Sequence, residues 1–205
     1  MNWLALDTAL GVKIILSVDG KIYTFTDEEY KMASAVLLPK IDELLSKANV
    51  KLSDIDVFAT TVGPGSFTGI RIAVNTARAF AYALNKPILG IDCLTVGAYS
   101  SDLDCSSVLY GWGDNYYIAT FDKNHNMISE AKAIKEDELA SLSGVIVADK
   151  ATQEVLSNAL VYDGTQAFIK AVEDKLGKGE TGSYEDVKPF YVMPSQAERD
   201  LINKK

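Results

Sequence analysis

Residues 57–84, VFATTVGPGSFTGIRIAVNTARAFAYAL, are the stretch that decides the fold of this chain. The stretch opens with an apolar run at 57–62 that is typical of a short buried strand. A glycine-rich turn, GPGSFTG, occupies 63–69, and a helical pattern follows over 70–84. A second apolar run lies at 88–91. A strand, a turn, a helix and another strand in this order predict an α/β fold.

The segment before this stretch has the pattern of three antiparallel strands. Runs rich in apolar and β-branched residues lie at 3–6, 12–18 and 21–25. Asp19-Gly20 separates the last two runs, and this dipeptide between two such runs is a strong hairpin signal. The three runs therefore predict a meander at the start of the sheet.

Residues 29–48 have helical periodicity, with one apolar face made of Tyr30, Ala33, Leu37, Ile41, Leu44, Leu45 and Ala48. Pro39 lies inside the pattern and predicts a kink or a split, because proline has no N–H to donate to the preceding turn. About the first 95 residues are therefore expected to follow the order β-β-β-α-β-α-β.

The second half of the chain begins like the first. Strands are expected at 107–110 and 116–121, with a third opening at Met127, so a three-stranded start recurs after about 105 residues. This recurrence predicts a duplicated domain, with one copy at 1–100 and a shorter copy at 101–205. The second copy continues with a strand at 145–148 and a helix at about 165–176.

Composition limits the function classes. The 205 residues carry a net charge of −8, with a net of −1 over residues 1–100 and −7 over residues 101–205. A negative net charge opposes the binding of a nucleic-acid phosphate backbone over a broad surface. Two cysteines and one histidine cannot build a structural zinc site. No signal peptide and no membrane span are expected, and reduced thiols favour a cytoplasmic protein.

The turn at 63–69 is a candidate anion site, because free N–H groups at a helix start can hold phosphate. Gly63, Gly65 and Ser66 would contribute to such a site, and the alternative is a tight turn with Ser66 as the helix N-cap. Asp7 and Thr8, which end the first strand, are further candidates for handling Mg²⁺ or phosphate. The alternative for Asp7 is a turn residue that accepts backbone N–H bonds.

Surplus apolar surface on the two helices predicts a protein–protein interface. The helix at 70–84 is apolar almost all round, and the helix at 29–48 carries an extra outward patch. The alternative is that the two helices pack on each other within the chain. The residues expected to bind a partner are Met32, Val36, Pro39, Ala73, Ala77 and Phe80.

The ordered pattern resembles the bacterial TsaB (YeaZ) family, which acts in making threonylcarbamoyladenosine in tRNA. The resemblance is strong over residues 1–97 and rests on LALDT at 4–8, LLPKIDELL at 37–45, VGPGSFTGIRIAVNTARAFA at 62–81 and NKPILGIDCL at 85–94. Later residues match in layout, with KPFYVMPSQAERD at 188–200 similar to the family's C-terminal segment. The resemblance implies the actin-like ATPase (ASKHA) fold of two ribonuclease-H-like domains.

The resemblance also implies a function. Members of the family are non-catalytic partners of the catalytic subunit TsaD, in a complex that works with the ATPase TsaE. The complex transfers a threonylcarbamoyl group to the adenosine beside the anticodon in tRNAs reading ANN codons. The chain is thus expected to be a scaffold without catalytic residues that pairs with TsaD, forms a homodimer when alone and meets tRNA only indirectly. No tightly bound cofactor is expected, although ATP or ADP at the partner interface is compatible with the resemblance.

Departures from the related patterns qualify these expectations. TsaD binds a metal through an HxxxH motif, and the matching positions here are Cys93 and Gly97, so no metal site is expected. A triplet Asp-Ala-Arg of the family corresponds to Tyr110, Gly111 and Trp112, and a common histidine corresponds to Ala33.

Two rival functions stay open. One is a small actin-like ATPase or kinase that uses Asp7, Thr8 and the turn at 63–69. The other is a peptidase with Ser66 as nucleophile. The peptidase is disfavoured because the segment is not GxSxG and the single histidine, His125, lies in a polar turn.

Overall fold

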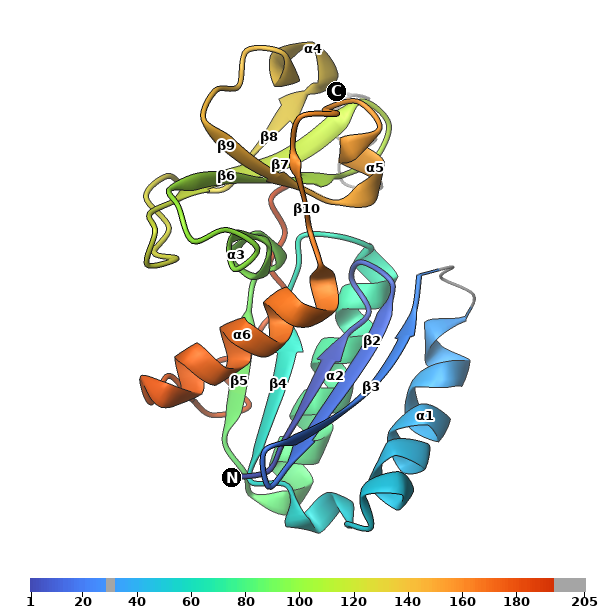
Figure 1. The fold of residues 1–205 in the computed structure, drawn as a ribbon. Helices are drawn as coiled ribbons and strands as arrows, with labels where there is room; N and C mark the ends of the chain where they lie inside the picture. The colour runs from blue at the N-terminus through green and yellow to red at the C-terminus, as the bar shows by residue number, and fades with distance from the viewer. Residues whose placement is uncertain (29–31, 194–205) are drawn as a thin grey trace.

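The computed structural model describes residues 1–28 and 32–193 and contains two five-stranded sheets, one above the other (Figure 1). The first sheet has the order β3-β2-β1-β4-β5, from β1 (Trp3–Asp7), β2 (Val12–Val18), β3 (Lys21–Asp27), β4 (Val57–Thr61) and β5 (Ile88–Ile91). The second has the order β10-β9-β6-β7-β8, from β6 (Cys105–Tyr110), β7 (Asn115–Phe121), β8 (Lys132–Lys135), β9 (Val145–Ala148) and β10 (Leu160–Val161).

The two sheets have the same topology. In each, the first strand pairs antiparallel with the second and parallel with the fourth, and the third and fifth strands form the edges. The predicted meander is confirmed, and Asp19 and Gly20 both have positive φ, as a tight hairpin turn requires. The repeated order confirms the predicted duplication.

The third strand of the second sheet was wrongly predicted. It begins at Lys132 rather than at Met127, which makes only an isolated bridge to Phe121. The Ser129 hydroxyl accepts the N–H of Thr120 at 2.9 Å, so a side chain replaces the ladder bond there. The ladder between β7 and β8 therefore forms only after this interruption.

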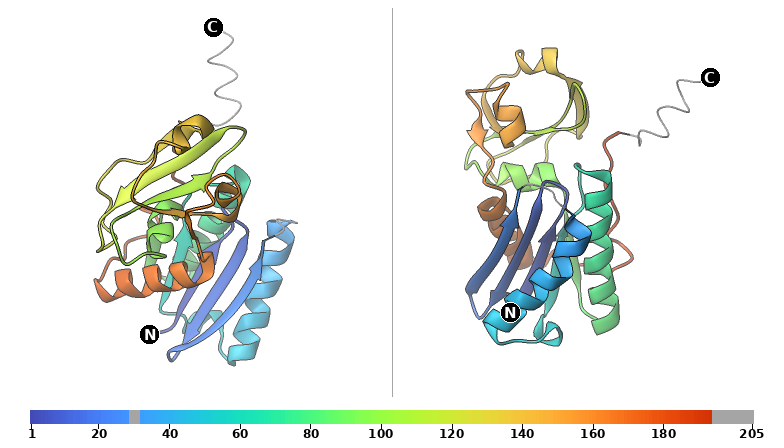
Figure 2. Two further views of the ribbon diagram at one scale, coloured as in Figure 1. Left: turned by 45° about the horizontal axis from the view of Figure 1, so that its top comes forward. Right: turned by 90° about the vertical axis from the view of Figure 1, so that its right-hand side faces the viewer.

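Helices α1 (Ala33–Ala48) and α2 (Phe67–Leu84) cover one face of the first sheet (Figure 2). Helix α1 runs through Pro39 without the predicted split, and residues 29–31 of the predicted helix lie outside the described part of the chain. Helix α2 begins three residues earlier than predicted. Its N-cap is Ser66, whose hydroxyl accepts the N–H of Gly69 at 3.2 Å.

The opposite face of the first sheet is covered by α6 (Gly164–Gly177), which comes from the second half of the chain (Figure 1). Phe168 and Ala171 of α6 pack with Trp3 and Ile15 in one buried cluster. The chain then runs back along the first sheet, where Phe190 N donates to Val62 O at 2.7 Å. Residues 164–193 thus complete the first half, and the expected division after residue 100 does not include this return.

The remaining short elements are η1 (Leu52–Asp54), α3 (Cys93–Ala98), α4 (Glu136–Leu139) and α5 (Lys150–Gln153). Helix α3 is entirely buried, and it contacts both α6 and β6. Among residues 1–28 and 32–193, no helix is long and apolar enough to cross a membrane.

Replacing Phe168 with alanine tests whether α6 belongs to the core of the first half. Phe168 is fully buried, so we expect Phe168→Ala to lower the free energy of unfolding by about 3–5 kcal/mol. Chemical denaturation followed by circular dichroism measures this loss. The matched control is Val161→Ala on the exposed edge strand β10, which should change stability by less than about 0.5 kcal/mol. A loss equal to the control's would mean that α6 does not contribute to the core.

Candidate functional site

A cleft of about 880 Å³ lies between the two halves of the chain and is lined by residues of both. The first half contributes Gly65, Ser66 and Phe67 from the start of α2, together with Lys13 from β2. The second half contributes the β6–β7 connection and the start of α5. This volume is within the range of small-molecule sites. The cleft is therefore the first candidate functional site.

Asp7 lies behind the wall of the cleft, and its carboxylate bonds to other groups of the chain. Its Oδ1 accepts hydrogen bonds from Ala9 N at 2.8 Å and from the Thr61 hydroxyl at 2.7 Å. Its Oδ2 pairs with Lys13 Nζ at 2.9 Å, and both side chains are buried. Removing one partner of such a pair leaves an uncompensated buried charge. This is the arrangement of a structural turn aspartate, the alternative left open by the sequence.

Thr8 is also buried, and its hydroxyl forms hydrogen bonds within the chain. Its hydroxyl donates to Gly69 O and accepts the N–H of Ala73 at 3.1 Å, so it joins β1 to the first turn of α2. A Cβ on Gly69 would overlap the carbonyl oxygen of Thr8. Gly69 therefore lets the helix approach the strand end.

The turn at 63–69 is only partly open to the cleft. Gly65 and Ser66 line it, whereas Gly63 is buried, and a Cβ there would lie 2.5 Å from Phe190 O. The structure thus places two of the five residues expected to handle phosphate on the wall and three behind it. Phosphate binding by this turn stays a prediction.

The cleft has aromatic walls that sequence reasoning did not find. From the first half, Phe67 stacks on Tyr191 with ring centroids 5.1 Å apart, and Arg71 lies 4.0 Å from the centre of the Phe67 ring. From the second half come Tyr110, Trp112 and Tyr117. The only sequence signal was the departure from the family pattern at 110–112.

The single histidine does not line the cleft. The ring of His125 stacks on Tyr99 with centroids 3.9 Å apart, and its Nε2 lies 3.0 Å from Ser101 O. Tyr99 in turn donates to Asp174 Oδ2 at 2.5 Å, and burial raises the pKa of Tyr99. Because Ser66 caps α2 and His125 stacks elsewhere, the two do not form a nucleophile and base.

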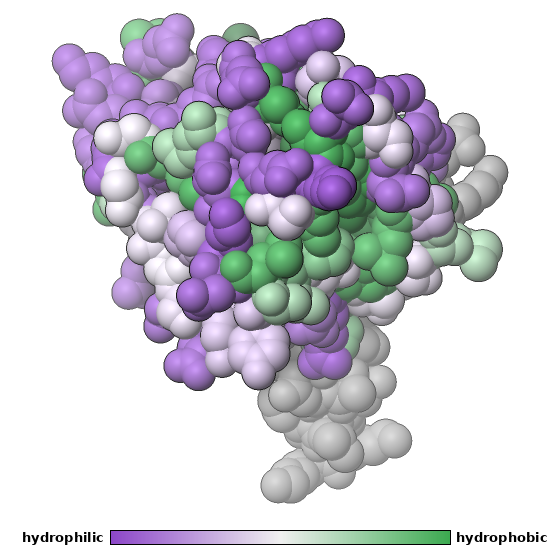
Figure 3. Space-filling model, turned by 90° about the horizontal axis from the view of Figure 1, so that it is seen from below, coloured by the Kyte–Doolittle hydropathy of each residue, from purple (hydrophilic) through white to green (hydrophobic). Residues whose placement is uncertain are grey.

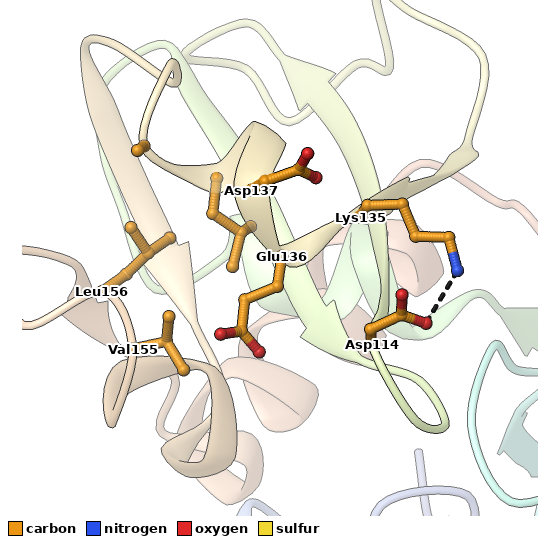
Figure 4. A pocket seen from close by; sticks show the side chains of 8 residues that line it. Asp114, Lys135, Glu136, Asp137, Val155 and Leu156 are labelled. Carbon is orange, nitrogen blue, oxygen red and sulfur yellow. Dashed lines mark hydrogen bonds and ion pairs between the residues drawn. The ribbon is translucent and has the colours of Figure 1, made fainter.

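A second hollow, of about 570 Å³, lies in the second half beside α4 (Figure 4). Asp114 pairs there with Lys135 at 2.7 Å, and this hydrogen bond lowers the pKa of Asp114. Glu136 and Asp137 add further carboxylates, while Val155 lies on the opposite side. Among the described residues no group of three or more histidine, cysteine, aspartate or glutamate side chains is arranged to hold a metal ion.

The second candidate site is the outward surface of α1 and α2. Met32 and Pro39 are exposed, Met32 by 71%, and Val36 is half-buried. Met32 stands at the N-cap of α1, and Pro39 lies two turns along it. These positions agree with the outward patch predicted for this helix. Seen from the end of the molecule where the chain begins, apolar side chains gather in the middle of the face, with hydrophilic ones around them (Figure 3).

The prediction for α2 was wrong at two positions. Ala73 and Ala77 are fully buried against the chain's own sheet, so they cannot face a partner. Phe80 is half-buried, with its ring 5.6 Å from that of Phe58. The exposed alanines are Ala79 and Ala83, one helical turn apart on the outward side. These two alanines, together with Met32, Val36 and Pro39 of α1, are called the helical surface below.

Comparison with known proteins adds an independent finding. Residues 30–165 match the family model described as TsaD: tRNA N6-adenosine threonylcarbamoyltransferase. Over 85 residues the chain is 40% identical to the tRNA threonylcarbamoyladenosine biosynthesis protein TsaB of Buchnera aphidicola subsp. Baizongia pistaciae, covering 41% of this chain and 38% of that protein. It is 26% identical to the protein of the same name from Escherichia coli, over the full length of both chains.

The structural comparison concerns the fold. YeaZ from Pseudomonas aeruginosa superposes with a TM-score of 0.79 at 20% identity, covering 93% of this chain and 99% of that one. The likeness and the repeated sheet order establish the actin-like arrangement of two ribonuclease-H-like domains, the second abbreviated.

Substitution of Gly65 tests whether the turn lies too close to the residues after β1 to accept a side chain. Gly65 has φ +155°, and a Cβ there would lie 2.6 Å from Ala9 O, so we expect Gly65→Val to destabilise the chain by about 1–3 kcal/mol. Thermal unfolding is the measurement. Gly177→Val is the control, because Gly177 has open space around its Cβ position. Equal melting temperatures for the two variants would show that the turn tolerates a side chain.

Proposed function

Because the chain belongs to the TsaD family, tRNA N6-adenosine threonylcarbamoyltransferase, we propose that it acts in the biosynthesis of threonylcarbamoyladenosine in tRNA as a non-catalytic subunit. In this proposal it pairs with a TsaD protein, in a complex that works with TsaE. The complex transfers the threonylcarbamoyl group to the adenosine beside the anticodon of tRNAs reading ANN codons. Alone, the chain forms a homodimer through the helical surface, which also binds TsaD in this proposal.

The observation that carries the proposal is the helical surface. Its exposed apolar side chains come from two neighbouring helices that the fold already holds on one face of the first sheet. Large exposed apolar patches on soluble proteins mark protein–protein interfaces. Ala79 and Ala83 have short side chains, which let a partner helix approach α2 closely. A helical partner therefore fits this surface.

The chemistry of the cleft supports a role without catalysis. Asp7, the carboxylate best placed by the sequence for Mg²⁺ or phosphate, is bonded to Lys13, Thr61 and Ala9. Cys93 and Gly97, at the positions of the TsaD metal ligands, are buried in α3. We therefore propose that the chain holds no metal and no tightly bound cofactor. If a nucleotide takes part, it is held where this chain meets its partner.

The charge of the chain bears on its partners and location. A net charge of −8 favours contact with a protein over direct contact with tRNA, so tRNA is reached through the complex. Because the proposed substrate is tRNA, we propose that the chain acts in the cytoplasm.

An ATPase or kinase that acts alone is the second candidate, and the cleft between the two halves favours it. ATP turnover by the purified chain would support this candidate. The buried state of Asp7 and Thr8 counts against it, because both would have to leave their present hydrogen bonds to reach a nucleotide.

Charge substitutions on the helical surface test the proposal. We expect Val36→Glu and Ala79→Glu each to abolish pairing, because a charge buried at the centre of an interface without a partner costs roughly 3–5 kcal/mol. Sedimentation velocity of the chain, alone and mixed with TsaD from the same organism, measures pairing. Circular dichroism checks that each variant is folded.

The control is Ser143→Glu, which adds the same charge at an exposed position of the second half. It should pair like the unaltered chain. Ala79 is already exposed, so its variant is expected to stay folded even if Val36→Glu does not. Pairing by both folded glutamate variants would place the interface elsewhere and contradict the proposal.

A further inference from the structure

One edge of the first sheet is left open by the fold. The strand at this edge is β3, which has seven residues, and no other strand of the described residues pairs beyond it (Figure 1). The opposite edge is covered, because Ile88 N donates to Gly182 O at 3.1 Å and Gly182 N donates to Ile88 O at 2.9 Å. In the second sheet the edge strands β10 and β8 have only two and four residues. Within the described part of the chain, β3 is therefore the longest open edge.

The hairpin turn before β3 determines which of its backbone groups point outward. Val18 and Lys21 flank the two-residue turn, so they form a hydrogen-bonded pair, and every second residue along β3 then bonds to β2 in the same way. The residues between them direct their N–H and C=O groups away from the sheet, and these are Ile22, Thr24 and Thr26. The last two are exposed. Such a row of outward groups is a template for another strand.

The sequence of β3 is complementary to itself in the antiparallel direction. When Thr24 of one copy faces Thr24 of a second copy, all seven residues of both strands are paired. Lys21 then faces Asp27, and Tyr23 faces Phe25, on each side of a two-fold axis. Opposite charges and aromatic pairs across two strands stabilise a sheet. The outward N–H and C=O groups of the two Thr24 residues meet at the centre, as an antiparallel ladder requires.

β3 also lacks the features that usually protect an edge strand. Its sequence, KIYTFTD, contains no proline, and its ladder with β2 runs from Lys21 to Asp27 without a bulge. The charges of these two residues cancel. Seven residues with strong β-propensity, no net charge and no proline are typical of strands that pair with copies of themselves. A second copy of the chain therefore fits this edge better than an unrelated strand does.

We propose that β3 pairs with β3 of a second copy of this chain, antiparallel and centred on Thr24, so that the two first sheets join into one. The pairing is two-fold, so this contact joins two copies and no more. A contact of one strand from each copy is small, and we expect a dissociation constant of about 100 μM. At low micromolar concentration, where sedimentation measures pairing through the helical surface, the β3 contact is open.

Disulfide trapping tests the contact and its register. The Cα atoms of a hydrogen-bonded antiparallel pair lie about 5.5 Å apart, which a disulfide can span. We expect Thr24→Cys at about 100 μM to form a covalent dimer with oxidised glutathione, measured by non-reducing electrophoresis. Thr26→Cys is the matched control, exposed on the same strand, whose two copies would lie about 14 Å apart and stay uncrosslinked. Both native cysteines are buried, so the unaltered chain should give no dimer.

Exchange of charges tests the same register by a second route. In the Thr24→Cys background, Lys21→Asp or Asp27→Lys places like charges opposite each other on both sides of the axis. Each is expected to slow cross-linking about threefold or more. The double variant places opposite charges together again and should restore the rate, which a local loss of structure would not do. Circular dichroism checks that every variant is folded.

The contact is independent of the proposed function, because it uses an edge strand and no residue of the helical surface. Ala79→Glu, which alters that surface, should leave cross-linking through Thr24→Cys unchanged. Loss of the cross-link in Ala79→Glu would overturn the β3 contact, because the thiols would then meet only within a dimer formed elsewhere. Absence of a Thr24→Cys dimer, equal cross-linking of Thr24→Cys and Thr26→Cys, or a double charge variant as slow as the single ones would also overturn it.

Discussion

The structure depends on the close approach of the turn at 63–69 to the end of β1. Gly65 and Gly69 both face the backbone of Thr8 and Ala9 at distances that no side chain allows. The backbone N–H of Ser66 bonds to Ala9 O at 2.9 Å, and the Thr8 hydroxyl bonds to both Gly69 O and Ala73 N. This joint, the set of contacts between residues 65–73 and residues 8–9, fixes where α2 starts and how it lies on the sheet. It therefore also decides which residues of α2 face outward.

Both candidate sites follow from that joint. On one side, the start of α2 forms a wall of the cleft, with Gly65, Ser66 and Phe67 exposed to it. On the other, the orientation of α2 buries Ala73 and Ala77 and turns Ala79 and Ala83 outward. The C-terminal segment strengthens the arrangement, because Arg78 Nε donates to Tyr184 O at 2.8 Å. The helical surface and the cleft therefore share one structural support but no residues.

Much of this could be predicted from the sequence, wherever a pattern is local. The strands at 12–18, 88–91 and 145–148 were found to the residue, since apolar runs between turn signals are sufficient for them. The outward face of α2 was predicted wrongly for a physical reason: when a helix is apolar almost all round, its sequence does not show which alanines are buried. Helix α3 has only six residues, too few to show a period.

Features that join distant parts of the chain were not predictable in the same way. The packing of α6 on the first sheet and the meeting of Phe67, Tyr191 and Trp112 at one cleft depend on topology rather than on any local motif. Asp7 is an intermediate case. The sequence left its role open between phosphate handling and a turn, and the structure shows its carboxylate bonded to Ala9 N, Thr61 and Lys13, as a turn residue would be.

We propose that this chain supports catalysis by another subunit and performs none itself. The most direct measurement is reconstitution with purified TsaD, TsaE and unmodified tRNA from the same organism, with threonylcarbamoyladenosine in the tRNA quantified by mass spectrometry. We expect product formation to require TsaD and to rise strongly when this chain is added. Product formed by this chain in the absence of TsaD, or a TsaD rate that the chain leaves unchanged, would contradict it.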